Sequence, residues 1–163
     1  KNLIKSYLKE NKVKNLNFLE EKNLLGTAGA IRMLRGKVKS DFFVINCDTI
    51  LSINLKKFYD YHRKNNYKIT LAAASKNFNL PYGSCEIKSN GQLKRITEKP
   101  DMNYLVNVGL YLIKPEIINL VPNNKFFEMD TLIKKIQKAR GSVGVFPIDE
   151  ENWHDTGQEE KKL

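Results

Sequence analysis

Two aspartates each follow an apolar stretch, at positions where a carboxylate can reach a ligand. Asp48 ends residues 43–48 (FVINCD), and Asp155 lies in residues 153–157 (WHDTG). A carboxylate at the end of an apolar strand costs free energy unless it meets water, a hydrogen-bond donor or a metal ion. Taken alone, Asp48 is also compatible with a helix N-cap or a turn, and Asp155 with a turn.

A third candidate places opposite charges side by side. Glu98 and Lys99 directly precede Pro100, which cannot donate a hydrogen bond to a sheet and so ends a strand. The same pattern describes a salt-bridged surface turn. In an ideal strand the two side chains point to opposite faces, so both line one site only where the strand end twists or bulges.

Glycines and an asparagine mark two further candidates. Residues 26–30 (GTAGA) are neither a Walker A loop nor a GxGxxG fingerprint. Gly26 and Thr27 either admit a flat base close to the backbone or open a helix with Thr27 as its N-cap. Asn107 and Gly109 interrupt an apolar stretch, and a buried Asn must find partners in the backbone or in a ligand.

The histidines and cysteines predict neither nucleophilic nor zinc chemistry. His62 falls on the apolar face of an expected helix, and neither it nor His154 has a Ser or Cys partner at a recognisable spacing. Cys47 and Cys85 form no CxxC pair, which indicates reduced thiols and favours a cytoplasmic protein.

Hydrophobic periodicity predicts the elements that would hold these residues. Helices are expected at residues 3–8, 27–34, 55–62, 116–120 and 132–136, and strands at 16–20, 42–45, 69–74, 82–87, 93–98, 105–113 and 142–148. The uninterrupted apolar run at 42–45 predicts an interior strand covered on both faces. Residues 42–74 form an expected βαβ unit, and Asn90-Gly91 predicts a hairpin turn.

These elements predict one α/β domain within 163 residues. The most economical architecture is a doubly wound, Rossmann-like mixed sheet with an inserted antiparallel hairpin. Ligands of such sheets bind beyond the carboxyl ends of the strands, where the polar candidates fall. The longest apolar run, residues 42–45, is far too short for a membrane helix, so we expect no membrane partner.

The net charge of +10 invites a nucleic-acid or phosphate ligand. Of the 28 basic residues, 23 are Lys and five are Arg, and no basic run exceeds two residues. Sequence-specific recognition of nucleic-acid bases uses mainly Arg, which is scarce here, so we expect no nucleic-acid partner.

Six short motifs, in order, resemble the sugar-1-phosphate nucleotidylyltransferases, with the mannose-1-phosphate guanylyltransferase-like branch as the nearest match. The motifs are residues 25–31 (LGTAGAI), 43–48 (FVINCD), 82–83 (YG), 98–100 (EKP), 107–111 (NVGLY) and 153–157 (WHDTG). The resemblance runs from about residue 3 to the end, and six ordered motifs are far more specific than any one.

The resemblance implies transfer of a nucleoside monophosphate, with GMP favoured, from an NTP to a sugar 1-phosphate with release of pyrophosphate. It implies that Asp48, Lys99 and Asp155 are catalytic. The two aspartates would hold Mg²⁺, which takes carboxylates together with phosphate oxygens and water. The other implied contacts are Lys99 with the sugar phosphate, Gly83, Glu98 and Asn107 with the sugar, and Gly26 and Thr27 with the base.

The sequence departs from the family pattern in two places. The family opens with a strand and a Gly-rich, Arg-bearing loop, followed by Pro-Lys-Pro, which cradle the triphosphate; residues 1–163 contain neither. We therefore expect a nucleotidyltransferase domain at 1–163 without its N-terminal strand and Gly-rich loop. Alone, it should release no pyrophosphate and should form homo-oligomers. Cys47 also stands where the family usually has Gly.

The alternative is a catalytically inactive relative that binds a sugar nucleotide as a regulator. Such a relative has no need to keep Asp48, Lys99 and Asp155 together, and all three are present.

Overall fold

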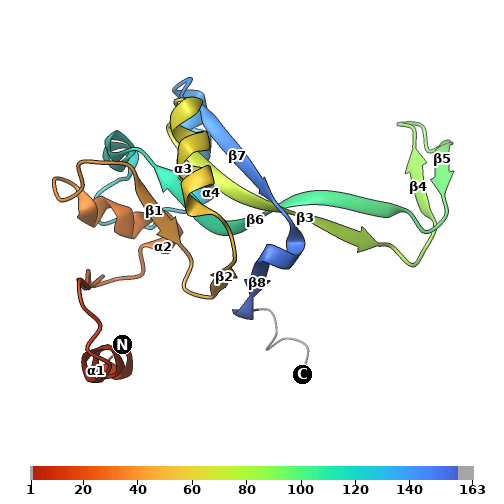
Figure 1. Cartoon of the computed structure of the whole chain (residues 1–163). Coiled ribbons are helices and arrows are strands. Elements are labelled where there is room, and N and C mark those ends of the chain that lie inside the picture. Colours follow the sequence, from red (N-terminus) through yellow and green to blue (C-terminus); the bar gives the residue numbers. More distant parts are fainter. Residues whose placement is uncertain (1, 158–163) are drawn as a thin grey trace.

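The computed structural model describes residues 2–157 and has a mixed four-stranded sheet at its centre (Figure 1). The strand order is β1-β6-β3-β7. β1 (Phe42–Ile45) and β3 (Ile69–Asn79) pair antiparallel with β6 (Asp101–Ile113), and β7 (Val143–Ile148) pairs parallel with β3. The expected α/β class with a mixed sheet is confirmed.

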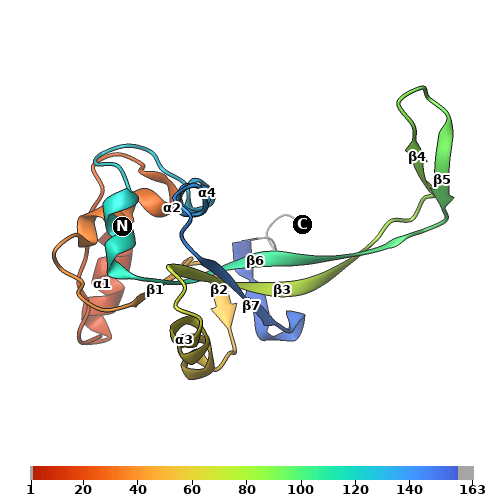
Figure 2. The ribbon, with the colours of Figure 1, turned by 90° about the horizontal axis from the view of Figure 1, so that it is seen from above.

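Apolar cores cover both faces of this sheet, and the view from above shows helices on either side of it (Figure 2). Tyr111 and Ile113 of β6 join one core, whereas Leu110 and Leu112 join the other, as the two-residue period of a strand requires. The first core contains residues of α2 (Gly26–Gly29), η1 (Ala30–Leu34), η2 (Pro115–Leu120) and α4 (Met129–Lys138).

The second core is closed by α3 (Leu55–Lys64), which presents Phe58 to the sheet. Phe58 is fully buried, and burial of such a side chain contributes about 2 kcal/mol. Asn54 caps the N-terminus of α3, because its side-chain oxygen accepts a hydrogen bond from the backbone nitrogen of Lys57. The expected helix at 55–62 and the doubly covered sheet are both present.

β1 lies at the edge of the described sheet, so the expected interior position is wrong. Phe42 and Val44 pack against the first core, but Phe43 and Ile45 are 39% and 52% exposed. The two strands of the predicted βαβ unit are not neighbours in the sheet, because β6 lies between β1 and β3. An apolar run shows that a strand is buried on at least one face and does not show which strands flank it.

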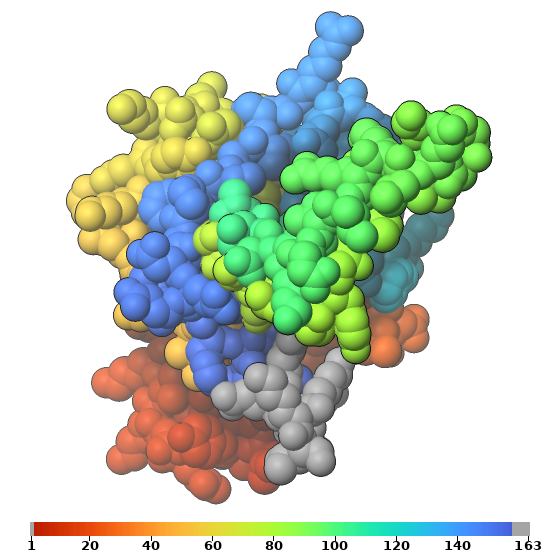
Figure 3. Space-filling model, turned by 90° about the vertical axis from the view of Figure 1, so that its right-hand side faces the viewer, coloured from red at the N-terminus to blue at the C-terminus, as the bar shows by residue number. Residues whose placement is uncertain are grey.

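β3 and β6 continue beyond the sheet as a two-stranded ribbon, which we call the arm (Figures 1 and 2). Its tip carries the predicted hairpin, β4 (Ser84–Ile87) and β5 (Leu93–Thr97), with Gly91 at a φ of 82° in the turn. In the space-filling view the green hairpin stands in front of the body (Figure 3).

The N-terminal segment is helical and then irregular. α1 (Asn2–Glu10) confirms the first expected helix but buries none of its residues. The strand expected at 16–20 is wrong: within residues 2–157 no strand pairs with this segment, and Leu16 and Phe18 are nearly half exposed.

A second small sheet pairs β2 (Thr49–Leu51) with β8 (Trp153–Asp155), and η3 (Glu150–Asn152) precedes β8. In the part of the chain that the structure describes, no helix is both long and apolar enough to cross a membrane.

Candidate functional site

The two candidate aspartates are brought together by β2 and β8. Asp48 directly precedes β2, and Asp155 ends β8 opposite Thr49. Thr156 donates two hydrogen bonds to the carbonyl oxygen of Asp48, one from its backbone nitrogen and one from Oγ1, each at 3.0 Å. The backbone around both carboxylates is therefore fixed by strand pairing and by Thr156.

Gly157 leaves space beside the two carboxylates. A Cβ on Gly157 would lie 3.0 Å from Asp48 Oδ2 and 3.4 Å from Asp155 Oδ1, so both oxygens border the same small volume. The backbone nitrogen of Gly157 donates to Asp155 Oδ1 at 3.0 Å. Two carboxylates beside an open point fit Mg²⁺, which commonly completes its shell with water and substrate phosphate oxygens. Among the described residues, no group of three His, Cys, Asp or Glu could hold a metal ion.

Trp153 packs β8 against the second core of the four-stranded sheet. Its ring packs against the second core, and Lys76 Nζ lies 5.5 Å from the ring centroid. The same Nζ lies 4.0 Å from Glu150 Oε1 in η3. Trp153 Nε1 is buried without a hydrogen-bond partner in the described structure. Sequence reasoning missed Lys76, since nothing in the local sequence relates it to a strand 77 positions later.

Glu98 and Gly83 meet at the end of the hairpin. Glu98 Oε2 lies 2.9 Å from the point where a Cβ of Gly83 would stand, so a side chain there would displace the carboxylate. β5 ends at Thr97, which leaves Glu98 and Lys99 beyond the strand, and Lys99 has a φ of 42°. The strict alternation of faces within a strand therefore does not apply to this exposed pair.

Thr27 caps a different helix from the expected one. Its Oγ1 accepts a hydrogen bond from the backbone nitrogen of Met129, at the start of α4, at 2.9 Å. The same hydroxyl donates to Glu128 Oε2 at 2.6 Å. The prediction that Thr27 caps its own helix is wrong, because α4 is close enough to take that hydroxyl. Sequence reasoning also missed Glu128, which lies 101 positions from Thr27.

Asn107 finds protein partners. Its side-chain nitrogen donates to the Tyr111 hydroxyl at 2.5 Å, and its oxygen accepts from the backbone nitrogen of Gly109 at 3.1 Å. Burial raises the pKa of Tyr111, and the hydrogen bond from Asn107 partly offsets that rise. Gly109 has a φ of 77° in β6, where its pairing with β3 is irregular, which explains the glycine in an apolar strand.

The predicted site residues thus form three separate groups, with Asn107 outside them on β6, opposite Ala73 of β3. Asp48 and Asp155 lie at β2–β8, Gly26 and Thr27 lie beside α4, and Gly83, Glu98 and Lys99 lie at the tip of the arm. Figures 1 and 2 both show the β4–β5 tip far from β2–β8 and from α2.

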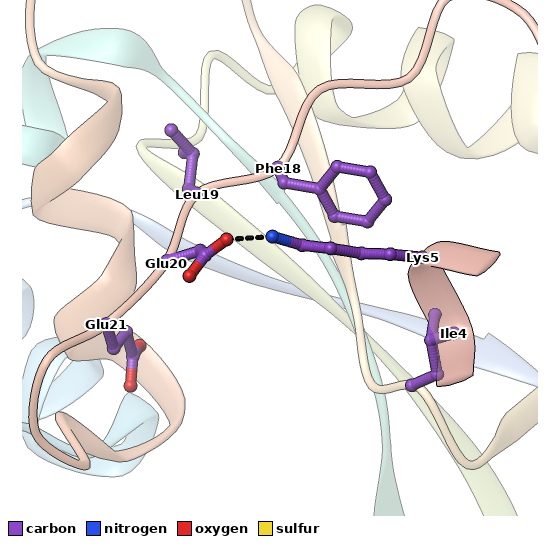
Figure 4. A pocket seen from close by; sticks show the side chains of 6 residues that line it. All are labelled: Ile4, Lys5, Phe18, Leu19, Glu20 and Glu21. Atoms are coloured by element: carbon purple, nitrogen blue, oxygen red, sulfur yellow. Dashed lines mark hydrogen bonds and ion pairs between the residues drawn. The ribbon is translucent and has the colours of Figure 1, made fainter. Parts of the chain in front are cut away.

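A cavity of about 280 Å³ lies between α1 and residues 18–21, apart from these groups (Figure 4). Ile4, Phe18 and Leu19 give it an apolar lining, and Lys5 forms an ion pair with Glu20 across it. A second hollow of about 320 Å³ includes Leu25 in its lining and so adjoins the Gly26–Thr27 group.

A family model described as nucleotidyl transferase matches residues 1–161. Mannose-1-phosphate guanyltransferase of Saccharomyces cerevisiae is 30% identical over 164 residues, covering 95% of this chain and 44% of that protein. Mannose-1-phosphate guanyltransferase 2 of Candida glabrata is 31% identical over 163 residues, with the same two coverages. The chain therefore spans about 44% of the length of these curated relatives.

Solved structures show the same similarity. The crystal structure of HddC from Yersinia pseudotuberculosis superposes with a TM-score of 0.67 at 28% identity, covering 96% of this chain and 68% of that one. HddC complexed with GMP-PN superposes with a TM-score of 0.66 at 25% identity, over the same shares of the two chains.

Proposed function

Because the chain belongs to the sugar-1-phosphate nucleotidyltransferase family, we propose that the protein transfers GMP from GTP to a sugar 1-phosphate and releases pyrophosphate. The choice of guanine is supported by two relatives named as guanyltransferases and by the GMP-PN complex of HddC. The choice of a sugar 1-phosphate is supported by the mannose 1-phosphate in the names of those two relatives.

The observation that carries this proposal is the pair of carboxylates at β2–β8. Asp48 Oδ2 and Asp155 Oδ1 border one small volume that Gly157 leaves open. These two residues would hold Mg²⁺, which neutralises charge on the transferring phosphate when it is bound. The strand pairing of Thr49 with Asp155 fixes the backbone that carries both carboxylates before any substrate arrives.

The remaining groups bind and orient the substrates. A phosphate oxygen of the sugar 1-phosphate attacks the α-phosphorus of GTP, the bond to the β-phosphate oxygen breaks, and pyrophosphate leaves. The Lys99 ammonium attracts the sugar phosphate, and the Glu98 carboxylate accepts hydrogen bonds from sugar hydroxyls. The reaction needs no covalent bond to the chain, so positioning and electrostatics supply the rate.

The position of Lys99 favours a second candidate function, a catalytically inactive protein that binds a sugar nucleotide as a regulator. Turnover requires Lys99 and the two aspartates to act on one pair of substrates. Lys99 lies between the end of β5 and the start of β6, and the β4–β5 tip stands far from β2–β8 (Figure 1). A protein that only binds a nucleotide sugar does not need to bring these groups together.

Turnover and binding measured side by side separate the two candidates. The full-length protein is mixed with GTP, Mg²⁺ and mannose 1-phosphate or another hexose 1-phosphate, and pyrophosphate release is followed. Thermal stability is measured with GDP-mannose, because a ligand that binds the folded state raises stability by mass action. Pyrophosphate release supports the transferase, and stabilisation without release supports the regulator. A protein that shows no release and no stabilisation contradicts both candidate functions.

A further inference from the structure

Glu128 is joined to the Gly26–Thr27 group by two hydrogen bonds that share one oxygen. Its Oε2 accepts from Thr27 Oγ1 at 2.6 Å and from the Thr27 backbone nitrogen at 3.3 Å. Glu128 is half-buried and occupies the N-cap position of α4, yet its side chain makes no capping hydrogen bond to that helix. Its carboxylate therefore serves the loop rather than its own helix.

Backbone hydrogen bonds reinforce this connection. The nitrogen of Phe127 donates to the carbonyl oxygen of Leu25 at 2.8 Å, and the nitrogen of Ala28 donates to that of Phe127 at 2.9 Å. Gly26, at a φ of 76°, lies so close that a Cβ would stand 2.9 Å from the Phe127 carbonyl oxygen and 3.1 Å from Glu128 Oε1. We call residues 25–28 with residues 127–129 the clasp.

The clasp determines what Thr27 can offer a ligand. A hydroxyl has one hydrogen to donate, and that hydrogen goes to Glu128. One of its lone pairs accepts from Met129. A nucleotide at this segment would therefore meet mainly backbone, and the shape of that backbone depends on Glu128.

We propose that Glu128 is a positioning residue for the nucleotide: it holds residues 26–28 in the conformation that receives the base. The inference rests on the proposed function for the identity of the ligand. It adds a residue outside the six motifs, on a different helix, whose carboxylate acts through Thr27 and does not touch the substrate.

Three variants of the full-length protein test the proposal. Glu128→Ala removes the acceptor, whereas Glu128→Gln keeps a side-chain oxygen that can accept from both Thr27 donors. Asp130→Ala is the matched control, because Asp130 lies in the first turn of α4 and, among residues 2–157, its carboxylate bonds only Thr131 and Lys134. It removes the same charge from the same helix end and leaves the clasp intact.

We expect Glu128→Ala to raise the dissociation constant and the KM for GTP about tenfold, the loss that one hydrogen bond of typical strength produces. The KM for the sugar 1-phosphate should change less than twofold. Glu128→Gln and Asp130→Ala should stay within threefold of the parent protein for both substrates. Equal losses for both substrates in Glu128→Ala, or an unchanged GTP affinity, would overturn the proposal.

Amide hydrogen exchange supplies a readout that needs no ligand. In Glu128→Ala the amides of Thr27 and Ala28 should exchange at least tenfold faster than in the parent. In Asp130→Ala the same two amides should exchange at the parent rate. Unaltered exchange in Glu128→Ala overturns the clasp itself. If the parent protein binds no nucleotide, the proposed function fails and the nucleotide role of Glu128 falls with it, even where the exchange data uphold the clasp.

Discussion

His62 is a buried base whose titration affects stability. Its side chain is fully buried, with Nδ1 2.7 Å from Thr70 Oγ1, and Nε2 lies 3.8 Å from Asp41 Oδ2 without a hydrogen bond. Burial lowers the pKa of His62 because the charged imidazolium loses its hydration. The charged groups around it are Asp41 and Glu116, which oppose this shift, and Lys114 and Arg63, which add to it.

The lowered pKa predicts a loss of stability in acid. At pH values well above about 6.5, the ordinary pKa of histidine, His62 is neutral in both states and its titration has no effect. Below that pH the unfolded chain takes up the proton more readily than the folded one, so the free energy of unfolding falls as the pH falls. Urea unfolding of the protein between pH 7.5 and 5.0 measures this slope.

One histidine variant identifies the group responsible. His62→Gln should flatten the acid slope of the unfolding free energy. The same slope in His62→Gln as in the parent would show that another group titrates.

Asp155→Asn tests the candidate metal carboxylates at the level of one atom. The amide keeps the size of the side chain and removes its charge, so the Mg²⁺ requirement should rise and turnover should fall roughly 10²- to 10³-fold. Asp60→Asn is a control on the surface of α3, where Asp60 forms an ion pair with Lys56. Parent-like rates at limiting Mg²⁺ would contradict the role of Asp155.

The arm is the element that carries the candidate sugar-phosphate contacts. Lys99→Met should raise the KM for the sugar 1-phosphate about tenfold or more, since a hydrogen bond to a charged group contributes about 1.5–3 kcal/mol. The KM for GTP should change little, because this ammonium faces only the sugar phosphate in the proposed reaction.

Lys94→Met is the matched control on the same hairpin, where Lys94 pairs with Glu86 across the strands at 2.9 Å. Equal increases in both KM values for Lys99→Met, or the same increase for Lys94→Met, would argue against a specific role for Lys99.

The parts of β3 and β6 that lie in the four-stranded sheet were predictable from the sequence, and the parts that form the arm were not. Residues 69–74 and 105–113 carry the apolar residues that cover the cores, and both predicted strands are present. The extensions to Asn79 and back to Asp101 form the arm, where backbone hydrogen bonds sustain pairing while large side chains such as Phe78 and Tyr104 stay exposed. Without a buried face, the sequence carries no period that would predict them.

At residues 16–20 the sequence predicted a strand that the structure does not contain. Leu16, Phe18 and Leu19 alternate with polar residues or adjoin them, which suggested a strand, yet each is at least 40% exposed. A strand needs a neighbour to take its hydrogen bonds, and none in residues 2–157 does so.

For the candidate site, each motif was visible in the sequence but their spatial relation was not. Asp48 and Asp155 were both expected to follow strands. Asp48 does follow β1, whereas Asp155 is the last residue of β8, and the sequence predicted neither β2 nor β8 nor their pairing. The partnership of Thr27 with Glu128 depends on packing between segments 101 positions apart. Local patterns carry no information on such contacts.

At the scale of the whole molecule, β1 presents an exposed edge beside an apolar groove. The groove has a volume of about 230 Å³ and is lined by Phe43, Ile45, Leu51, Ile53, Leu55 and Leu110. An unpaired edge next to exposed apolar side chains favours pairing with another strand. β7, the strand at the other end of the sheet, contains Pro147, which cannot donate to a further strand.

We therefore expect residues 1–163 to self-associate through β1, as sedimentation velocity at increasing concentration would show. Ile45→Lys should shift the protein towards monomer, because a charge at the edge opposes strand pairing. Val145→Lys is the control, since Val145 is a comparably exposed residue on β7. A monomeric parent protein at all concentrations would contradict the expectation.

Trp153 gives the chain a built-in optical reporter. It is the sole tryptophan among 163 residues, and it lies two positions before Asp155 on the same strand. Its indole is already in contact with a cation, Lys76 Nζ, and its buried nitrogen has no hydrogen-bond partner in the described structure. Any event that shifts β8 alters the electric field at this one fluorophore, so we expect emission from the unlabelled protein to respond to movement of the strand that carries Asp155.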